Sequence, residues 1–346
     1  MSGLSLIAYE PVHEQGLYAR EFVDDLTGNH EGYRHVIRAV GGFESANFRL
    51  MGTRDYLDGW FEDGLMRRVV LYNPEGIPIW EGFVNRLRYS VGSLQKTRSM
   101  DGMYDRVVQL YTPIVSEPEE PVIVDPPLDP MYDDAASVAE WGVKAVFVSG
   151  GEMTDEEAFA WARAILRDRA QPSLGESVNT QATSAPFMDV ECKGYYHTLK
   201  WMPFLPEETA CTVSAAEIQA HQAIQEILKF YNECVNPGWI STDFGWMDYN
   251  FLAYRQRSSQ KSCWDVIADV IRLGGAGGER WVGGLYQDRQ MIYKPAEALD
   301  ALYGDYLLLK RSLEDREQKI YDELDIPIKP WDMVPDRILK TVDLLM

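Results

Sequence analysis

The segment Ser262–Pro295, SCWDVIADVIRLGGAGGERWVGGLYQDRQMIYKP, is the part of the chain whose fold the sequence indicates best. Ser262 and Asp265 have the spacing of a helix cap. Apolar residues then recur every three or four positions on one helical face, at Trp264, Ile267, Ala268 and Ile271. Two glycines at 274 and 275 predict the end of the helix. The aromatic and β-branched stretch from 281 to 293, with a polar turn at 287–290, predicts a β-hairpin. The segment contains no reactive constellation of side chains, which is typical of a part that builds a surface or a ring.

Composition and charge limit the class of protein. A chain of 346 residues with 46% hydrophobic and 12% aromatic residues can bury about two cores. Its 54 acidic residues against 33 Lys and Arg give a net charge of −21. Phosphate groups and anionic membranes both require clusters of Lys and Arg, so the charge argues against direct nucleic-acid binding and against docking on a membrane. Solubility alone is the simplest explanation of the acidic surface.

The cysteines and the hydropathy pattern indicate a reducing compartment. The four cysteines at 192, 211, 234 and 263 form neither a CxxC pair nor a Cys/His cluster, which predicts buried thiols rather than zinc ligands or disulfides. We expect no transmembrane helix, because no apolar run reaches 18 residues. The N-terminus has no basic region followed by an apolar core, so we expect no signal peptide.

The pattern of apolar runs and turns predicts four regions. Residues 1–113 are expected to form an N-terminal β domain, 114–152 a proline- and acid-rich connector, 153–304 a second α+β domain, and 305–346 C-terminal strands that complete a β domain. In the first region, we expect strands at 34–40, 44–51, 69–72, 77–87 and 106–111. The turn 73–76 predicts a hairpin, and Pro78 favours an edge strand.

Helix signals concentrate in the second half. Thr154 and Glu157 form a predicted capping box for a helix at 154–169, and Ser214 with Glu217 predicts another for a helix at 214–234. Strands are expected at 187–192 and 196–201. Beyond residue 305 the pattern is ambiguous: periodicity permits a helix at 312–324, and strands are expected at 326–329 and 337–342.

The predicted fold class is α+β and β-rich. It comprises two related β-barrel-like or β-sandwich domains, a few packed helices and the connector. The relation between the domains depends on a short similarity of pattern between 101–111 and 190–199, for which chance is the alternative. The connector is a solvated tether or a segment that reaches a neighbouring subunit.

Motifs of catalysis are not found. The five histidines lie in no HExxH motif and beside no cysteine, and there is no GxSxG elbow. The tightest acidic pairs, Asp24–Asp25 and Asp133–Asp134, are expected in solvated turns. The glycine run 274–278 lacks the Lys-Ser/Thr of a phosphate loop and follows a helix. We therefore predict no enzyme, no catalytic residue, and no metal or cofactor site.

A succession of segments along residues 33–343 resembles one protein family. The segments are GFESA at 42–46, WFEDGL at 60–65, IWEGFV at 79–84, then 104–111, 158–172, 190–201, 262–295 and IKPWDMVPDRI at 328–338. Together they resemble the tail-hub proteins of tailed bacteriophages, which are related to the baseplate hub. Asp336 departs from the glycine expected in the ending of that pattern.

The resemblance implies a structural virion protein, assembled in the host cytoplasm. Such a protein would form the ring, or hub, at the distal end of the tail tube, with a homotrimer favoured over a hexamer. Its partners would be the tail tube protein, the distal tip or fibre proteins and, as a further candidate, the tape measure protein. DNA would pass through an acidic channel without specific binding, and no stable membrane insertion is implied.

The sequence offers candidate interface residues and two alternative functions. Candidate interface residues are Trp60, Phe61, Trp331, Glu117, Glu119, Glu120 and Asp125. Core packing is the alternative for the aromatic residues. The alternative function is a carbohydrate-binding or glycan-degrading tail-tip protein, which needs exposed aromatic faces and, for catalysis, two buried carboxylates at glycosidase spacing. A cytosolic regulatory module is a third hypothesis with no positive feature.

Overall fold

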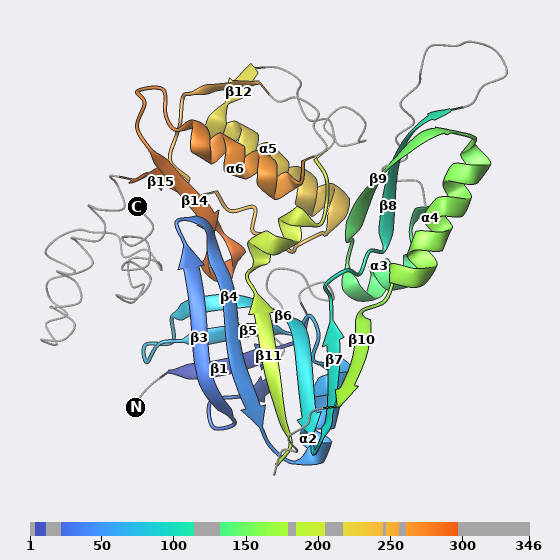
Figure 1. Cartoon of the computed structure of the whole chain (residues 1–346). Helices are drawn as coiled ribbons and strands as arrows, with labels where there is room; N and C mark the ends of the chain where they lie inside the picture. Colours follow the sequence, from blue (N-terminus) through green and yellow to red (C-terminus); the bar gives the residue numbers. More distant parts are fainter. Residues whose placement is uncertain are drawn as a thin grey trace, which may run out of the picture.

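The computed structural model describes residues 4–11, 22–113, 132–178, 185–204, 217–244, 247–255 and 261–296 (Figure 1). Several predictions therefore lie outside the described residues. These are the C-terminal helix and strands, Trp331, the Ser214 cap, and the acidic candidates Glu117, Glu119, Glu120 and Asp125.

One eleven-stranded sheet forms the body of the molecule. Its strand order is β15-β14-β4-β11-β6-β5-β1-β2, with β3 paired to β4, β7 to β6 and β10 to β7. The strands are β1 (Ser5–Tyr9), β2 (Phe22–Asp25), β3 (His30–Arg38), β4 (Val40–Met51), β5 (Arg68–Tyr72), β6 (Pro78–Val91), β7 (Leu94–Ser99), β10 (Ser173–Val178), β11 (Phe187–Lys193), β14 (Trp281–Leu285) and β15 (Met291–Pro295). The predicted strand-rich α+β class is confirmed, and the described strands close no barrel.

The sheet crosses the predicted domain boundaries. β11 comes from the predicted second domain, yet it lies between β4 and β6 of the predicted first domain and pairs antiparallel with both. Regions 1–113 and 153–304 therefore contribute strands to a single sheet. The sequence of a strand does not show which distant strand it pairs with, because its pattern of apolar and polar residues would be the same beside other partners.

The hairpin turn at 73–76 is confirmed, but Pro78 does not mark an edge strand. The Asn73 side-chain Oδ1 accepts hydrogen bonds from the backbone N–H groups of Glu75 (3.1 Å) and Ile77 (2.8 Å) and so closes the turn between β5 and β6. β6 is an interior strand between β5 and β11. Pro78 is its first residue, next to an irregularity in the pairing with β5, and a proline at that position removes little of the ladder.

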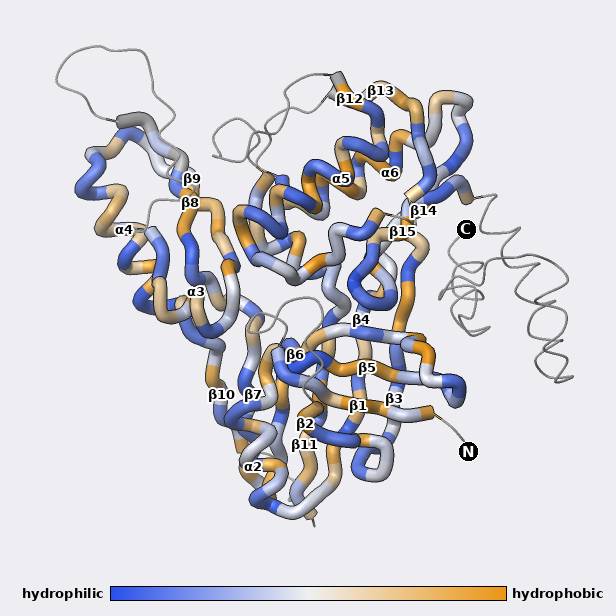
Figure 2. Tube along the Cα trace, turned by 180° about the vertical axis from the view of Figure 1, so that it is seen from behind, coloured by the Kyte–Doolittle hydropathy of each residue, from blue (hydrophilic) through white to orange (hydrophobic). Residues whose placement is uncertain are grey.

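A helical layer covers one end of the sheet. α5 (Ala220–Phe230) packs on α6 (Cys263–Leu273), which contacts β14 and the 3-10 helix η2 (Tyr195–Lys200). Figure 2 shows apolar and polar residues alternating along both α-helices, as amphipathic packing requires. The predicted cap of α6 is confirmed, since the Ser262 Oγ accepts the Asp265 N–H at 3.1 Å.

One prediction in this layer is wrong, and the helix predicted at 214–234 is confirmed except for its start. Residues 195–200 form η2 rather than a strand, because Tyr195, Thr198 and Leu199 are buried at helical spacing. α5 begins after Gln219, which forms a capping box with Gln222, because β12 (Glu217–Gln219) is held by pairing with β13 (Ala253–Arg255). The similarity between 101–111 and 190–199 is thus not one of structure, since the first segment enters a strand and the second enters η2.

A smaller unit stands beside β7 and β10 (Figure 1). Here β8 (Arg106–Pro113) pairs parallel with β9 (Ala145–Met153), and α4 (Asp155–Arg169) packs against both. A short helix, α3 (Ala135–Trp141), precedes β9, and α2 (Arg54–Asp63) lies against β6 in the main sheet. The capping box of α4 is confirmed: the Thr154 Oγ1 accepts the Glu157 N–H, and Glu157 accepts the Thr154 N–H.

The cysteines follow the prediction only in part. Cys192 and Cys263 are free and buried. Cys234 is disulfide-bonded, which corrects the expectation of a thiol there. Spacing along the chain cannot show which cysteines the fold brings together. Across the described ranges, no helix is long and apolar enough to cross a membrane.

Two glycine pairs allow β14 to join β4. Gly283 and Gly284 run parallel to Val40 and Gly41, and a Cβ at Gly284 would lie 2.2 Å from the backbone nitrogen of Gly42. Gly42 has a φ of +85°, and a Cβ there would lie 2.0 Å from the Leu285 carbonyl oxygen. The close approach explains why both strands carry glycine at the contact.

We expect Gly42→Ala to lower the free energy of unfolding by about 3 kcal/mol, from the positive φ and the collision with backbone. Urea denaturation followed by tryptophan fluorescence measures the loss. Gly59→Ala on α2 is the matched control, since nothing lies within 4 Å of its Cβ position. Equal stability of the two variants would contradict the account of the junction.

Candidate functional site

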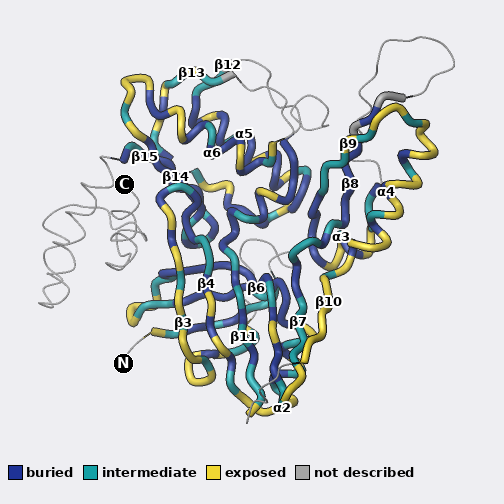
Figure 3. Tube along the Cα trace, in the orientation of Figure 1, coloured by how far each residue is buried: buried dark blue, intermediate teal, exposed yellow. Residues whose placement is uncertain are grey.

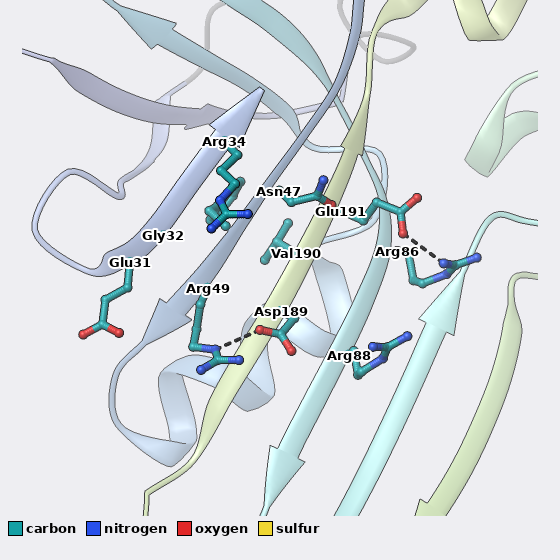
Figure 4. Close-up of a pocket in the computed structure, with 11 residues that line it drawn as sticks. Glu31, Gly32, Arg34, Asn47, Arg49, Arg86, Arg88, Asp189, Val190 and Glu191 are labelled. Carbon is teal, nitrogen blue, oxygen red and sulfur yellow. Dashed lines mark hydrogen bonds and ion pairs between the residues drawn. The ribbon is translucent and has the colours of Figure 1, made fainter. Parts of the chain in front are cut away.

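Charged side chains line a hollow on one face of the main sheet. Side chains alternate along each strand, so Asn47 and Arg49 of β4 share a face with Asp189 and Glu191 of β11 and with Arg86 and Arg88 of β6. The register places Asp189 between Arg49 and Arg88, and Glu191 between Asn47 and Arg86. With Glu31, Gly32 and Arg34 of β3, these residues line a hollow of about 470 Å³, here called the polar groove (Figure 4).

Ion pairs hold part of the polar groove rigid. The Arg49 Nε lies 2.8 Å from the Asp189 Oδ1, and an Arg86 terminal nitrogen lies 2.9 Å from the Glu191 Oε2. Arg86 also binds Asp101, whose Oδ1 lies 2.8 Å from the Lys193 Nζ. Although burial opposes it, the hydrogen bond and charge of Lys193 lower the pKa of Asp101 to about 2. These pairs fix Arg49 and Arg86 against the sheet.

Arg34 and Arg88 are the arginines that remain available. Both are exposed, on β3 and β6 respectively. Within the part of the chain that the structure describes, neither forms an ion pair. Figure 4 shows them on opposite sides of the Arg49–Asp189 pair. The polar groove can therefore offer guanidinium groups to an anionic partner.

The edge strand β10 is a second candidate surface. All six of its residues are exposed (Figure 3), and among the described strands it pairs only with β7. Leu174 is 67% and Val178 76% exposed, and Val178 lies opposite Leu94, which is 39% exposed. An edge strand presents unpaired N–H and C=O groups, which native sequences normally protect with charges, proline or a bulge. Edge strand β3 carries such charges at Glu31, Arg34 and Arg38, whereas β10 carries only Glu176.

Two exposed aromatic residues form a third surface. Tyr249 is 75% and Phe251 68% exposed, on either side of the buried Asn250. The Asn250 amide donates to the Gly274 carbonyl at 2.9 Å and to the Tyr293 hydroxyl at 2.6 Å, which holds the segment against α6 and β15. Both rings contact the buried His221 edge-on. We call Tyr249 and Phe251 the aromatic patch. The alternation of aromatic, polar and aromatic residues at 249–251 is the feature of the sequence from which it could have been predicted.

The predicted aromatic interface residues lie elsewhere. Trp60 is only 2% exposed, and its Nε1 donates to the Asp24 Oδ2 at 3.1 Å, so it belongs to the core of the described chain. Phe61 is half-buried against Tyr89. The two residues are adjacent in the sequence, but α2 directs the Trp60 ring into the core.

Three of the four carboxylates in the acidic pairs have structural roles rather than positions in solvated turns. Asp24 lies in β2 and also accepts the Tyr56 hydroxyl at 2.6 Å. Asp133 binds Arg106 through both carboxylate oxygens. Asp134 caps α3, with its side chain accepting the Ser137 N–H at 3.0 Å. Asp25, by contrast, is exposed at the end of β2 and accepts the Thr27 N–H at 2.9 Å, as expected for a solvated turn. The expectation of solvated turns is therefore corrected for Asp24, Asp133 and Asp134 only.

The titratable groups with the most perturbed surroundings lie partly or fully inside the protein. Burial lowers the pKa of His197 to about 3, so its ring is neutral near pH 7. Glu81 and Asp105 are the buried carboxylates of the described chain, at 1% and 0% exposure, and no soluble substrate can reach them. No cluster of three or more His, Cys, Asp or Glu suited to a metal occurs in the ranges described.

Comparison with protein-family models, with curated proteins and with solved structures finds no match.

Proposed function

We propose that the chain is a structural virion protein that forms the ring at the distal end of a phage tail tube. The observation that carries the proposal is β10, an exposed edge strand with apolar side chains and one charge. An unprotected edge of this kind favours pairing with another chain. A ring subunit provides such a partner in every copy, because a heterologous interface repeats around the symmetry axis.

Further features support an assembly role. The aromatic patch offers the residue types that anchor protein interfaces. The proposed ring is a homotrimer that binds the tail tube protein on one side and tip or fibre proteins on the other. The net charge of −21 suits a channel that repels DNA phosphates, so that DNA slides through without specific binding. A neutral or basic channel in the assembled ring would contradict this last point.

Charging the edge strand should prevent assembly. We expect Leu174→Lys/Val178→Lys to weaken self-association at least tenfold, because two ammonium groups would have to be desolvated at the interface. Native mass spectrometry and sedimentation velocity of the purified protein, alone and with its tail partners, measure the oligomer.

Ala160→Lys/Ala164→Lys on the exposed face of α4 is the control, because it adds the same charge away from the edge. A wild-type chain that stays monomeric both alone and with tail partners would contradict the proposed ring. An oligomer that tolerates the β10 variant would show that the ring uses other surfaces.

The aromatic patch also favours a second candidate, a carbohydrate-binding tail-tip protein. Exposed aromatic faces stack on sugars, and Tyr249 and Phe251 lie side by side on one short segment. Hydrolysis additionally needs two accessible carboxylates about 5–10 Å apart, while Glu81 and Asp105 are enclosed. Binding of soluble glycans that is lost in Tyr249→Ala would favour this second function.

A further inference from the structure

The polar groove carries positive charge in an acidic protein. Four arginines and three carboxylates line it, whereas the whole chain has a net charge of −21. The ion pairs to Asp189 and Glu191 neutralise two of these carboxylates. Arg34 and Arg88 remain exposed, and the terminal nitrogens of Arg49 form no hydrogen bond with the described residues. The groove therefore has three guanidinium groups that can donate to an anionic partner.

The spacing of these groups suits an extended acidic peptide. Arg34 and Arg88 are separated by three strand steps, from β3 across β4 and β11 to β6. Strands lie about 4.8 Å apart, so the separation across the sheet is about 14 Å. An extended peptide advances about 3.3 Å per residue. Carboxylates four or five residues apart would therefore reach both sides of the groove.

The chain itself contains a segment with that chemistry. Residues 114–131, IVSEPEEPVIVDPPLDPM, contain five acidic residues, five prolines and no Lys or Arg. Asp125 and Asp129 are four residues apart, and Glu120 precedes Asp125 by five. Proline-rich sequences favour extended conformations without internal hydrogen bonds, which lowers the entropy lost on binding.

We propose that the polar groove binds the acidic segment 114–131 of a second copy of this chain. The inference rests on the proposed ring, in which each subunit has a neighbour. A neighbour is the favoured source because the segment is flanked by β8 and α3, which stand on the side of the sheet away from β3 (Figures 1 and 2). Each subunit would thus fasten the next around the ring through charge pairs.

Charge reversal on each side tests the contact. The groove variant is Arg34→Glu/Arg88→Glu and the segment variant is Glu120→Lys/Asp125→Lys. We expect each alone to raise the dissociation constant of the oligomer at least tenfold at low salt, through lost attraction and new repulsion. Combining the four substitutions in one chain should restore the constant to within about threefold, since the charges again match.

Mixing the two variants identifies the source of the segment. The groove variant retains a wild-type segment and the segment variant retains a wild-type groove, so an equimolar mixture should form mixed oligomers. If the chain with all four substitutions associates like the wild type but the equimolar mixture does not, the segment binds its own subunit and the proposal is overturned. If Arg163→Glu/Arg167→Glu on the exposed side of α4 weakens association as much as the groove variant does, a general charge effect overturns it.

A direct binding measurement separates this inference from the proposed ring. We expect a fluorescent peptide of residues 114–131 to bind the full-length segment variant, whose own segment is repelled. Affinity should fall at least tenfold with Arg34→Glu/Arg88→Glu and should weaken as salt is raised. A peptide that does not bind overturns the inference while leaving a ring intact. A wild-type chain that is monomeric in every condition overturns both.

Discussion

Replacing Glu81 with alanine is expected to lower the free energy of unfolding by about 3–5 kcal/mol, the usual result of removing one partner from a buried ion cluster. Glu81 is 1% exposed, and its Oε1 lies 2.8 Å from the Arg68 Nε and 3.7 Å from the Arg289 Nε. Both arginines are 1% exposed. Alanine would remove the buried carboxylate that lies closest to the Arg68 guanidinium, whose other acidic neighbour, Asp288, is 4.0 Å away and 45% exposed.

Glu81 also holds a strained turn. Its Oε2 accepts the Asp288 N–H at 2.8 Å, and Asp288 and Arg289 have positive φ values of 52° and 59°. Non-glycine residues adopt this conformation only where their surroundings fix it. Glu81 thus joins the turn of the β14–β15 hairpin to β6. Its loss should destabilise this turn in addition to leaving the arginines without its charge.

Urea denaturation measures the effect, and Glu176→Ala on the exposed β10 is the control. A second variant separates charge from shape. Arg68→Met/Glu81→Leu/Arg289→Met replaces the cluster with apolar side chains of similar length, and it should cost much less than Glu81→Ala. A loss below about 1 kcal/mol in Glu81→Ala would contradict the compensating role, by comparison with known buried pairs.

The elements predicted correctly are those whose signals are local. The α6 helix has its cap at Ser262, its apolar stripe and its glycine stop within a few residues, and the hairpin that follows has its turn between two aromatic strands. The same holds for α4 and for the hairpin at 73–76. Helix caps, apolar periodicity and tight turns depend on residues only a few positions apart, so they can be predicted directly from the sequence.

The polar groove could not be predicted in this way. Arg49 and Asp189 are 140 residues apart and meet only because β11 lies between β4 and β6. The burial of Glu81 could not be predicted either, because it depends on β6 being an interior strand. For Trp60, core packing, the alternative to an interface role, is confirmed, because the helix buries this ring and leaves Phe61 half-buried. Register and strand order decide these positions, and neither is encoded locally.

The contribution of Asp105 to the stability of the protein is expected to fall as pH rises from about 4 to about 7. This side chain is fully buried between β8 and the segment that leads to β9, and its Oδ1 accepts the Lys144 N–H at 2.6 Å. Burial raises the pKa of Asp105 to about 7, against the hydrogen bond from Lys144 and the charge of Arg106, which lower it. The ordinary pKa of the group is 3.8. The folded state therefore holds this proton more tightly than the unfolded state does.

The sign follows from proton linkage. Between pH 4 and 7 the unfolded chain releases the proton and the folded chain keeps it, so each pH unit costs at most about 1.4 kcal/mol of stability. Other groups act in the same range: the lowered pKa of His197 makes stability rise with pH between about 3 and 6.5. The total curve thus mixes opposing contributions, and a difference between variants is needed to isolate Asp105.

Asp105→Asn removes the titration and keeps the acceptor that the Lys144 N–H uses. We expect the stability of this variant, relative to the wild type, to rise by a few kcal/mol between pH 4 and 7 and to change little up to pH 8. Urea titrations at each pH give the difference, with Asp168→Asn on the exposed side of α4 as the control. Lys144, whose pKa is lowered to about 8 by burial, contributes only above that window. Parallel curves for Asp105→Asn and the wild type would mean that Asp105 is ionised in the folded protein and paired with its cationic neighbours.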